Sequence, residues 1–139
     1  MFASATASSV SLRQAGTYKQ MHAATRVDYM SPHGLIEMLY DGLIGAMTEA
    51  RGAIRNRNIA AKGHAIARAV RIVDEGLNAS LNFSDGGALA VQLHALYDYV
   101  AIRLTHANLN NDEAVIEECV RLIEPVRSAW SQIADRAPA

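Results

Sequence analysis

The sequence contains one cysteine, three prolines and few aromatic residues, and it has no long run of apolar residues. A single cysteine excludes an internal disulfide and a zinc site built from several thiolates of this chain. No stretch approaches the roughly 20 consecutive apolar residues that cross a bilayer. Residues 1–14 also lack the positive start and apolar core of a secretory signal. We therefore expect a soluble, cytosolic protein that does not insert into a membrane.

An excess of charge of either sign is missing as well. Thirteen Lys and Arg residues stand against fourteen Asp and Glu residues, so the formal net charge is −1. A nucleic-acid-binding protein needs surplus cations to neutralise phosphates, so this composition argues against nucleic acid as a partner. No phosphate-binding loop and no nucleophilic serine motif occurs in the chain. The sequence therefore gives no positive sign of an enzyme.

What the sequence does have is hydrophobic periodicity. Half of its 139 residues are hydrophobic, which is enough for one globular core. Apolar residues recur at alternating steps of four and three over residues 32–55, 59–82, 87–107 and 111–134, which predicts four helices. Clusters of polar and glycine residues separate these segments.

Short connections determine how these helices pack. Successive helices joined by a few residues must run antiparallel, and the simplest closure is an up-down bundle. We expect an all-α fold, an antiparallel up-down four-helix bundle over residues 31–134. Residues 1–30 are predicted to form a flexible N-terminal arm with room for a short docking helix, and residues 135–139 a disordered tail.

Pro125 falls inside the last predicted helix. A proline in a helix interior removes one hydrogen bond, clashes with the preceding turn and costs about 3 kcal/mol. We predict a kink near residues 121–125. The alternative is that two shorter helices replace the single long one.

Candidate metal ligands are few. His33, Glu37 and Asp41 follow one another at steps of four, so one helix face could carry all three. A di-metal bundle would need Glu-x-x-His pairs on two helices, and the chain has none. A solvated helix face explains the three residues better, and Cys119 on an apolar seam is typical of an inert core thiol. We therefore predict no metal site and no cofactor.

Several helices carry a second apolar line beside the first. One interpretation is a widened stripe that serves an ordinary bundle core. The other is a groove that receives an amphipathic helix from a partner, and glycines inside the predicted helices favour it because small side chains leave room for another backbone. Close packing between the protein's own helices also explains the glycines. The second line includes Leu35, Leu39, Gly42, Ile72, Gly76, Tyr97, Tyr99, Ile102 and Trp130.

Two stretches resemble a known family. They are TRVDYMSPHGLIEMLYDGLIGAMTEA at residues 25–50 and LYDYVAIRLTHAN at residues 96–108, and together with Trp130 near the end of the last helix they are similar to the FliS family of flagellin export chaperones. The similarity extends in order over about residues 18–133. Departures from the family pattern are a longer N-terminus rich in Ser and Ala, a single tyrosine in the arm, and Pro125.

The resemblance implies a cytoplasmic helical bundle without catalytic activity. Such a chaperone binds the disordered C-terminal segment of flagellin, prevents its premature polymerisation and accompanies it to the flagellar type III export gate. It also implies that the N-terminal arm covers part of the hydrophobic surface until the client replaces it.

The resemblance and the second apolar line together suggest client contacts, although internal packing stays an alternative for Leu39, Tyr97 and Trp130. The alternative function is that of a structural module that docks permanently in a larger assembly. Whether the protein forms a homodimer is left open. The candidate contacts are Tyr18, Met21, Leu35, Leu39, Ile72, Tyr97, Tyr99, Ile102 and Trp130.

Overall fold

The computed structural model describes residues 31–136, with side chains through residue 133. The expected arm at residues 1–30 and the chain end at residues 137–139 lie outside the described residues. Within the described part every regular element is helical. The elements are α2 (Pro32–Arg55), α3 (Ile59–Arg71), the π-helical segment η2 (Ile72–Leu77), the 3₁₀ turn η3 (Asn78–Ser80), α4 (Phe83–Asn110) and α5 (Glu113–Arg136).

Polar side chains mark where the helices begin and end. The side chains of Ser31, Asn58 and Asn82 each accept a hydrogen bond of 3.0 Å from the backbone N–H three residues later, at the starts of α2, α3 and α4. Each bond satisfies an N–H group that has no partner inside its helix. Asn111 ends α4 in the left-handed conformation, with φ of 53°. The connections between successive helices are therefore short.

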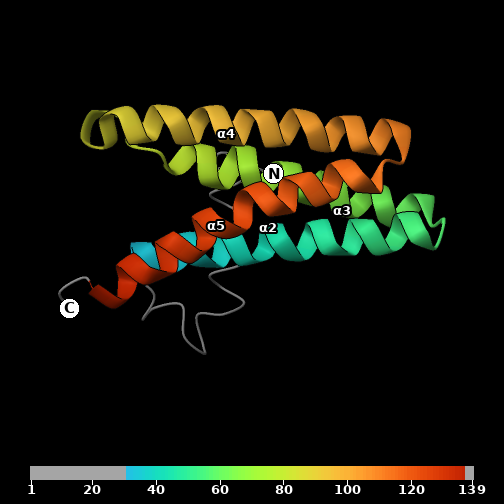
Figure 1. The fold of residues 1–139 in the computed structure, drawn as a ribbon, viewed down its shortest axis with the longest axis horizontal. Coiled ribbons are helices and arrows are strands. Elements are labelled where there is room, and N and C mark those ends of the chain that lie inside the picture. Colours follow the sequence, from blue (N-terminus) through green and yellow to red (C-terminus); the bar gives the residue numbers. More distant parts are fainter. Residues whose placement is uncertain (1–30, 137–139) are drawn as a thin grey trace, which may run out of the picture.

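The four helices close into a ring (Figure 1). α2 packs on α3, α3 on α4, α4 on α5, and α5 returns to α2, while η2 contacts both α2 and α4. Because each connection is only a few residues long, successive helices run antiparallel. The expected all-α four-helix bundle is confirmed.

The second expected helix, residues 59–82, is not one regular α-helix. The α-helical hydrogen-bond pattern ends at Arg71. The chain then continues through the π-helical η2 and the 3₁₀ turn η3. This segment lies unusually close to α2: a Cβ added to Gly76 would be 3.1 Å from Leu39, and one added to Gly42 would be 3.4 Å from Ile72. These two glycines therefore serve close packing between the protein's own helices.

α4 begins earlier than the expected residue 87. Its first turn, from Phe83, is separated from the regular helix by Gly87, whose φ of 53° and ψ of −127° suit only glycine. From residue 88 to Asn110 the helix is regular. The position at which the regular part of α4 begins therefore depends on the backbone conformation of Gly87.

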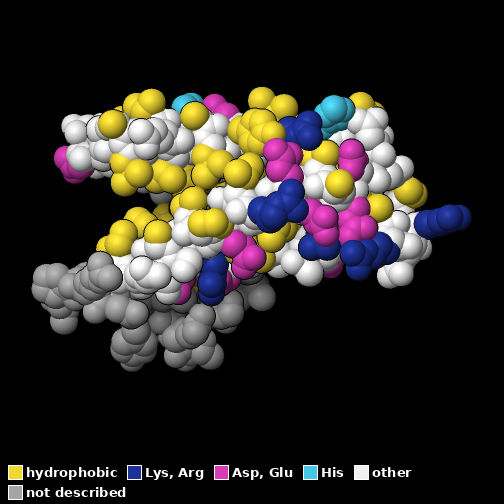
Figure 2. Space-filling model, in the orientation of Figure 1, with side chains coloured by type: hydrophobic (Ala, Val, Ile, Leu, Met, Phe, Trp, Pro, Cys, Tyr) yellow, Lys and Arg dark blue, Asp and Glu magenta, His cyan; other side chains and the backbone are white. Residues whose placement is uncertain are grey.

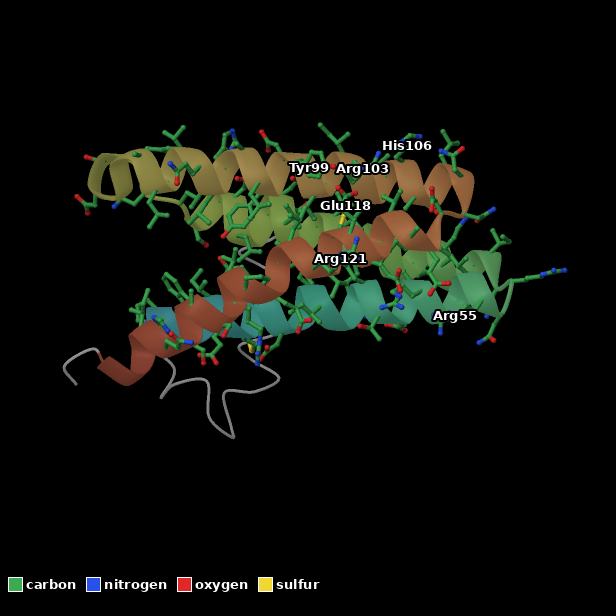
Figure 3. The ribbon with its side chains drawn as sticks, in the orientation of Figure 1. Arg55, Tyr99, Arg103, His106, Glu118 and Arg121 are labelled. Carbon is green, nitrogen blue, oxygen red and sulfur yellow. The ribbon has the colours of Figure 1, made fainter. Side chains whose placement is uncertain are left out.

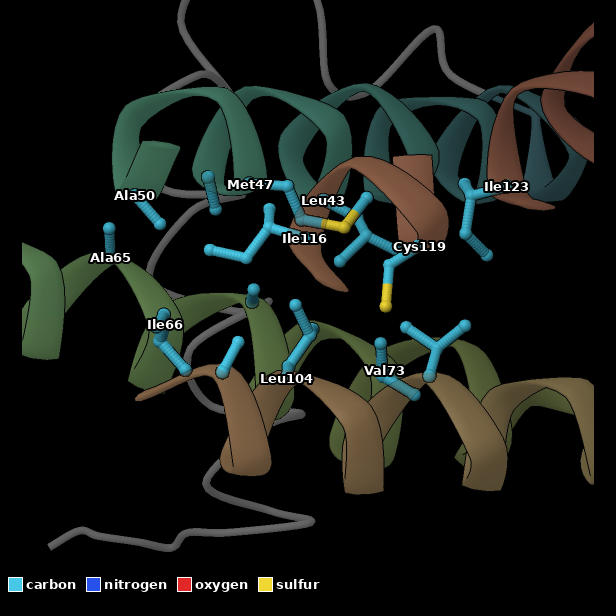
Figure 4. Packing of buried hydrophobic residues seen from close by; sticks show 14 of the residues in the cluster. Leu43, Met47, Ala50, Ala65, Ile66, Val73, Leu104, Ile116, Cys119 and Ile123 are labelled. Carbon is cyan, nitrogen blue, oxygen red and sulfur yellow. The ribbon is translucent and has the colours of Figure 1, made fainter. Parts of the chain in front are cut away.

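The core fills the space between the four helices (Figure 4). Two buried tyrosines meet inside it, with 2.5 Å between the hydroxyl oxygens of Tyr40 and Tyr97. Burial raises the pKa of both phenols, so both are neutral and can share one hydrogen bond. Cys119 is fully buried, and burial raises the pKa of its thiol to about 11, as expected for an unreactive core thiol.

α5 continues as one helix through Pro125. The alternative of two shorter helices is therefore wrong. Both Pro125 and Arg121, whose carbonyl loses its helical N–H partner, are exposed, so water can satisfy that carbonyl. The kink itself stays a prediction.

Candidate functional site

α5 carries a line of apolar residues on the side that faces the core, which we call its seam. This seam becomes exposed toward the C-terminal end of the helix. Cys119 is fully buried, Val126 seven residues later is half-buried, and Ile133 another seven residues later is 53% exposed. Steps of seven keep these residues on nearly the same side of the helix. The neighbouring helices therefore cover the first half of the α5 seam but not its last two turns.

The line of apolar residues from Val100 to Leu89 on α4 becomes exposed toward the N-terminal end of the helix, although Ala90 beside it stays buried. Val100 is fully buried, Leu93 and Leu96 are half-buried, and Leu89 is 61% exposed. Because α4 and α5 are antiparallel, the N-terminal end of α4 and the C-terminal end of α5 lie at the same end of the bundle (Figure 1). Two core seams are thus uncovered side by side.

A small polar cluster joins α4 to α5 where the two helices are still close. Tyr99 donates a hydrogen bond of 2.6 Å to one carboxylate oxygen of Glu118, and Arg103 donates one of 3.2 Å to the other (Figure 3). The hydrogen bond from Tyr99, followed by that from Arg103, lowers the pKa of Glu118. In the part of the chain that the structure describes, no other side-chain hydrogen bond or ion pair connects these helices.

Beyond this cluster the side-chain contacts of α5 are with α2, which α5 also contacts in its first half. Arg127 pairs with Asp41 at 2.5 Å, and Ser131 donates a hydrogen bond of 3.0 Å to Glu37. The indole N–H of Trp130 donates another, also of 3.0 Å, to a backbone carbonyl of α2. These contacts hold the second half of α5 on α2, and Figure 1 shows this half diverging from α4.

The divergence leaves an apolar groove. Figure 2 shows the molecule hollowed between α4 and the helices below it at this end, with hydrophobic side chains along both sides. Leu96 and Leu89 precede Arg103 by seven and fourteen residues, so they lie on the side of α4 that faces α5. We call this surface the α4–α5 groove, and define it by Leu89, Leu93 and Leu96 on α4 and Leu122, Val126 and Ile133 on α5.

The candidate contacts deduced from the sequence do not form one surface. Leu39 and Ile72 are half-buried between α2 and η2, and Tyr97 belongs to the core, so its side chain is not open to a partner. Tyr99 and Ile102 are exposed on α4. Leu35 and Trp130 are half-buried, whereas Tyr18 and Met21 lie outside the described residues.

Comparison with known proteins identifies the family. The family model described as "Flagellar protein FliS" matches residues 14–137. The chain belongs to the FliS family. It is 42% identical over 120 residues to the flagellar secretion chaperone FliS of Salmonella typhimurium, covering 86% of this chain and 89% of the relative. It is 36% identical over 116 residues to FliSB of Pseudomonas aeruginosa (84% and 91% covered), and 32% identical over 116 residues to FliS of Vibrio cholerae (84% and 85% covered).

Membership of the FliS family makes the chain a flagellar secretion chaperone and not an enzyme. The three residues of the alternative metal site have other partners: Glu37 and Asp41 bind α5 as described, and His33 stacks on Trp130 with 4.3 Å between ring centroids. No group of three or more metal-ligating side chains occurs among the described residues. Nor is any helix within residues 31–136 long and apolar enough to span a membrane.

Sequence reasoning missed the groove: none of its six residues is among the candidate contacts. The periodic pattern assigned all six of its residues to core seams, because an apolar residue at the right spacing looks the same whether or not a neighbouring helix covers it. A signal was nevertheless present. The apolar seams of the last two predicted helices continue over their whole length, so the spacing itself marks these residues as apolar positions.

Proposed function

We propose that the α4–α5 groove binds the disordered C-terminal segment of flagellin as that segment becomes helical. The chaperone would hold this segment in the cytosol, prevent its premature polymerisation and accompany the subunit to the flagellar type III export gate. The observation that carries the proposal is the simultaneous exposure of two core seams at one end of the bundle. An amphipathic helix laid there would continue the bundle's own packing.

The dimensions of the groove suit a short helix. From Leu122 to Ile133 α5 advances about 17 Å, which is three turns. Fully burying one aliphatic side chain contributes about 1.5–3 kcal/mol, and six such side chains are partly uncovered here. A disordered client must spend part of this gain on ordering its backbone. The balance favours tight but reversible binding, as an export chaperone requires.

The N-terminal arm is proposed to occupy the groove before the client arrives. Residues 1–30 join the bundle at Ser31, and α2 begins at the open end of the bundle (Figure 1). Tyr18 and Met21 would then serve as placeholders for client side chains. Deleting residues 1–24 should leave the bundle folded and change the affinity for the client, and an unchanged affinity would remove the arm from the mechanism.

The test is calorimetric titration of the full chain with a peptide from the C-terminal segment of flagellin. We expect a one-to-one complex that Leu89→Asp weakens by about tenfold or more, because a carboxylate in an apolar groove must lose its hydration. Ile59→Asp is the matched control, since Ile59 is 62% exposed and lies at the opposite end of the bundle. Equal losses in both variants, or none in either, would contradict the proposal.

Reversibility separates this function from the alternative of a structural module that docks permanently. A chaperone should elute alone as a soluble protein, and a labelled peptide in the complex should exchange with unlabelled peptide. A complex that never exchanges would favour the permanent module.

A further inference from the structure

A pocket lies at the end of the bundle where α4 turns into α5, which we call the closed end. The turn between α2 and α3 lies at the same end (Figure 1). The pocket measures about 500 Å³, within the range of about 300–1,000 Å³ that is typical of small-ligand sites. We call it the closed-end pocket. The side chains that line it include Ile54, Ile59, Arg57, Asn58, Lys62 and Asn111.

Lys62 brings a buried positive charge to the closed-end pocket. The residue is only 6% exposed. Its ammonium donates a hydrogen bond of 2.9 Å to the carbonyl of Asn108 and another to Oδ1 of Asn111, so one of its three N–H donors is left over. Both acceptors are neutral, and Lys62 forms no ion pair within the described residues. A buried charge without a counter-charge is costly, and an anion in the pocket would offset that cost.

The carboxylates at the closed end already have other partners. Glu113 and Glu117 bind Arg51 at 3.3 Å and 2.6 Å. Asp112 accepts a hydrogen bond of 3.3 Å from the backbone N–H of Val115 and so caps the start of α5. The described part of this chain therefore does not supply the missing anion.

The other polar side chains of the pocket also have donors left over. Oδ1 of Asn58 accepts a hydrogen bond of 3.0 Å from the N–H of Ala61, and Oδ1 of Asn111 accepts the one from Lys62. Both amide oxygens are thus occupied, whereas both NH₂ groups remain. Arg57 carries only donors, and it belongs to no ion pair among the described residues. A ligand of this pocket must therefore bring acceptors.

The backbone at Arg57 is unusual for an arginine. Its φ of 57° lies in the left-handed region, at a position after α2 where glycine or asparagine is preferred. The turn is held by hydrogen bonds from the N–H groups of Arg57 and Asn58 back to the last residues of α2. It places an exposed guanidinium on the pocket beside the buried ammonium.

We propose that the closed-end pocket binds an acidic peptide segment of another protein, in which an aliphatic side chain stands next to a carboxylate. Lys62 and Arg57 bind the carboxylate, whose two oxygens match the paired donors of a guanidinium. Ile54 and Ile59 contact the aliphatic side chain. A phosphate group offers nothing to this apolar wall, so a carboxylate beside hydrocarbon is the better match.

The N-terminal arm of the chain does not supply this segment. Residues 1–30 contain one acidic residue, Asp28, which stands three positions before Ser31 at the open end. Three residues span at most about 11 Å, whereas α2 separates the two ends of the bundle by about 36 Å over its 24 residues. The pocket and the α4–α5 groove lie at opposite ends, so a second partner can bind while a client is held.

Nuclear magnetic resonance titration of the full chain with the peptide acetyl-Gly-Leu-Asp-Gly-amide tests the proposal. We expect saturable shifts confined to the amides of residues 54–62 and 108–111. The same peptide with Asn in place of Asp should bind at least about tenfold more weakly, because it keeps the shape and loses the charge.

Arg57→Met should weaken binding of the acidic peptide by about threefold to tenfold. Arg57 is exposed, so its loss leaves the fold intact. Arg71→Met is the matched control: it removes the same charge from an exposed residue at the far end of α3 and should leave the affinity unchanged. Equal effects of the two substitutions would overturn the proposal, since they would report net charge alone.

Three further results would contradict the proposal. The first is equal binding of the Asp and Asn peptides. The second is an affinity for inorganic phosphate as high as that for the acidic peptide, which would indicate a general anion site. The third is loss of the flagellin peptide in Arg57→Met, because the pocket would then be part of the client surface.

Discussion

The two ends of the bundle are built differently. At the end where α4 turns into α5, polar groups seal the helices: the buried Lys62 donates hydrogen bonds to the carbonyl of Asn108 and to the side chain of Asn111, and Arg51 binds Glu113 at 3.3 Å. At the other end the seams of α4 and α5 are apolar and uncovered. A small bundle can therefore place most of its stabilising contacts at one end and leave the other end uncovered for binding a partner.

The largest effect should come from the sealed part of the core. Leu104→Ala should lower the free energy of unfolding by about 2–5 kcal/mol, because Leu104 is fully buried and its loss leaves a cavity. Leu89→Ala, on the uncovered seam of the same helix, should change it by less than about 0.5 kcal/mol. Urea unfolding measures both. Equal losses would show that the groove is covered in solution.

A smaller effect should follow from removing the charge that seals the closed end. Lys62→Met should cost about 1–3 kcal/mol, since it leaves the backbone carbonyl of Asn108 and the side-chain Oδ1 of Asn111 without their buried donor. Arg57→Met is the control, because Arg57 is exposed and belongs to no ion pair among the described residues. Thermal unfolding compares the two variants, and similar melting temperatures would contradict the sealing role.

At the open end, backbone conformation should matter more than contacts. Gly87→Ala should cost about 1–2 kcal/mol, because alanine tolerates the positive φ of this position poorly. Gly45→Ala, inside α2 with open space around it, should instead stabilise the protein by up to about 1 kcal/mol. Chemical denaturation of both variants gives the two signs, and a stable Gly87→Ala variant would show that the first turn of α4 is free to rearrange.

The smallest effect concerns pH and the cluster that joins α4 to α5. Because Tyr99 and Arg103 lower the pKa of Glu118 in the folded state, the stabilisation is present above the ordinary carboxylate pKa of about 4.3. It is lost as pH falls through the lower folded value. Glu118→Gln should therefore reduce the loss of stability on acidification, measured by unfolding at a series of pH values. An unchanged profile would mean that the cluster adds nothing to stability.

Much of the fold could be predicted from local sequence. Ser31 and Pro32 begin α2, and the polar turn at residues 56–58 ends it, because caps and turn residues act on the backbone within a few positions. The regular spacing of apolar residues identified the core side of each helix. The glycines were ambiguous, and contacts between distant segments decided them: Gly42 and Gly76 pack against other helices, while Gly45 has open space.

The sequence by itself determined four helices, their order and the apolar side of each, because hydrogen bonds and side-chain periodicity link residues three or four positions apart. Tertiary structure alone decided which seams stay uncovered. That choice depends on contacts such as Arg127 with Asp41, which join residues far apart in the chain and hold the second half of α5 on α2. No local pattern encodes such a divergence, since burial depends on where the neighbouring helices end.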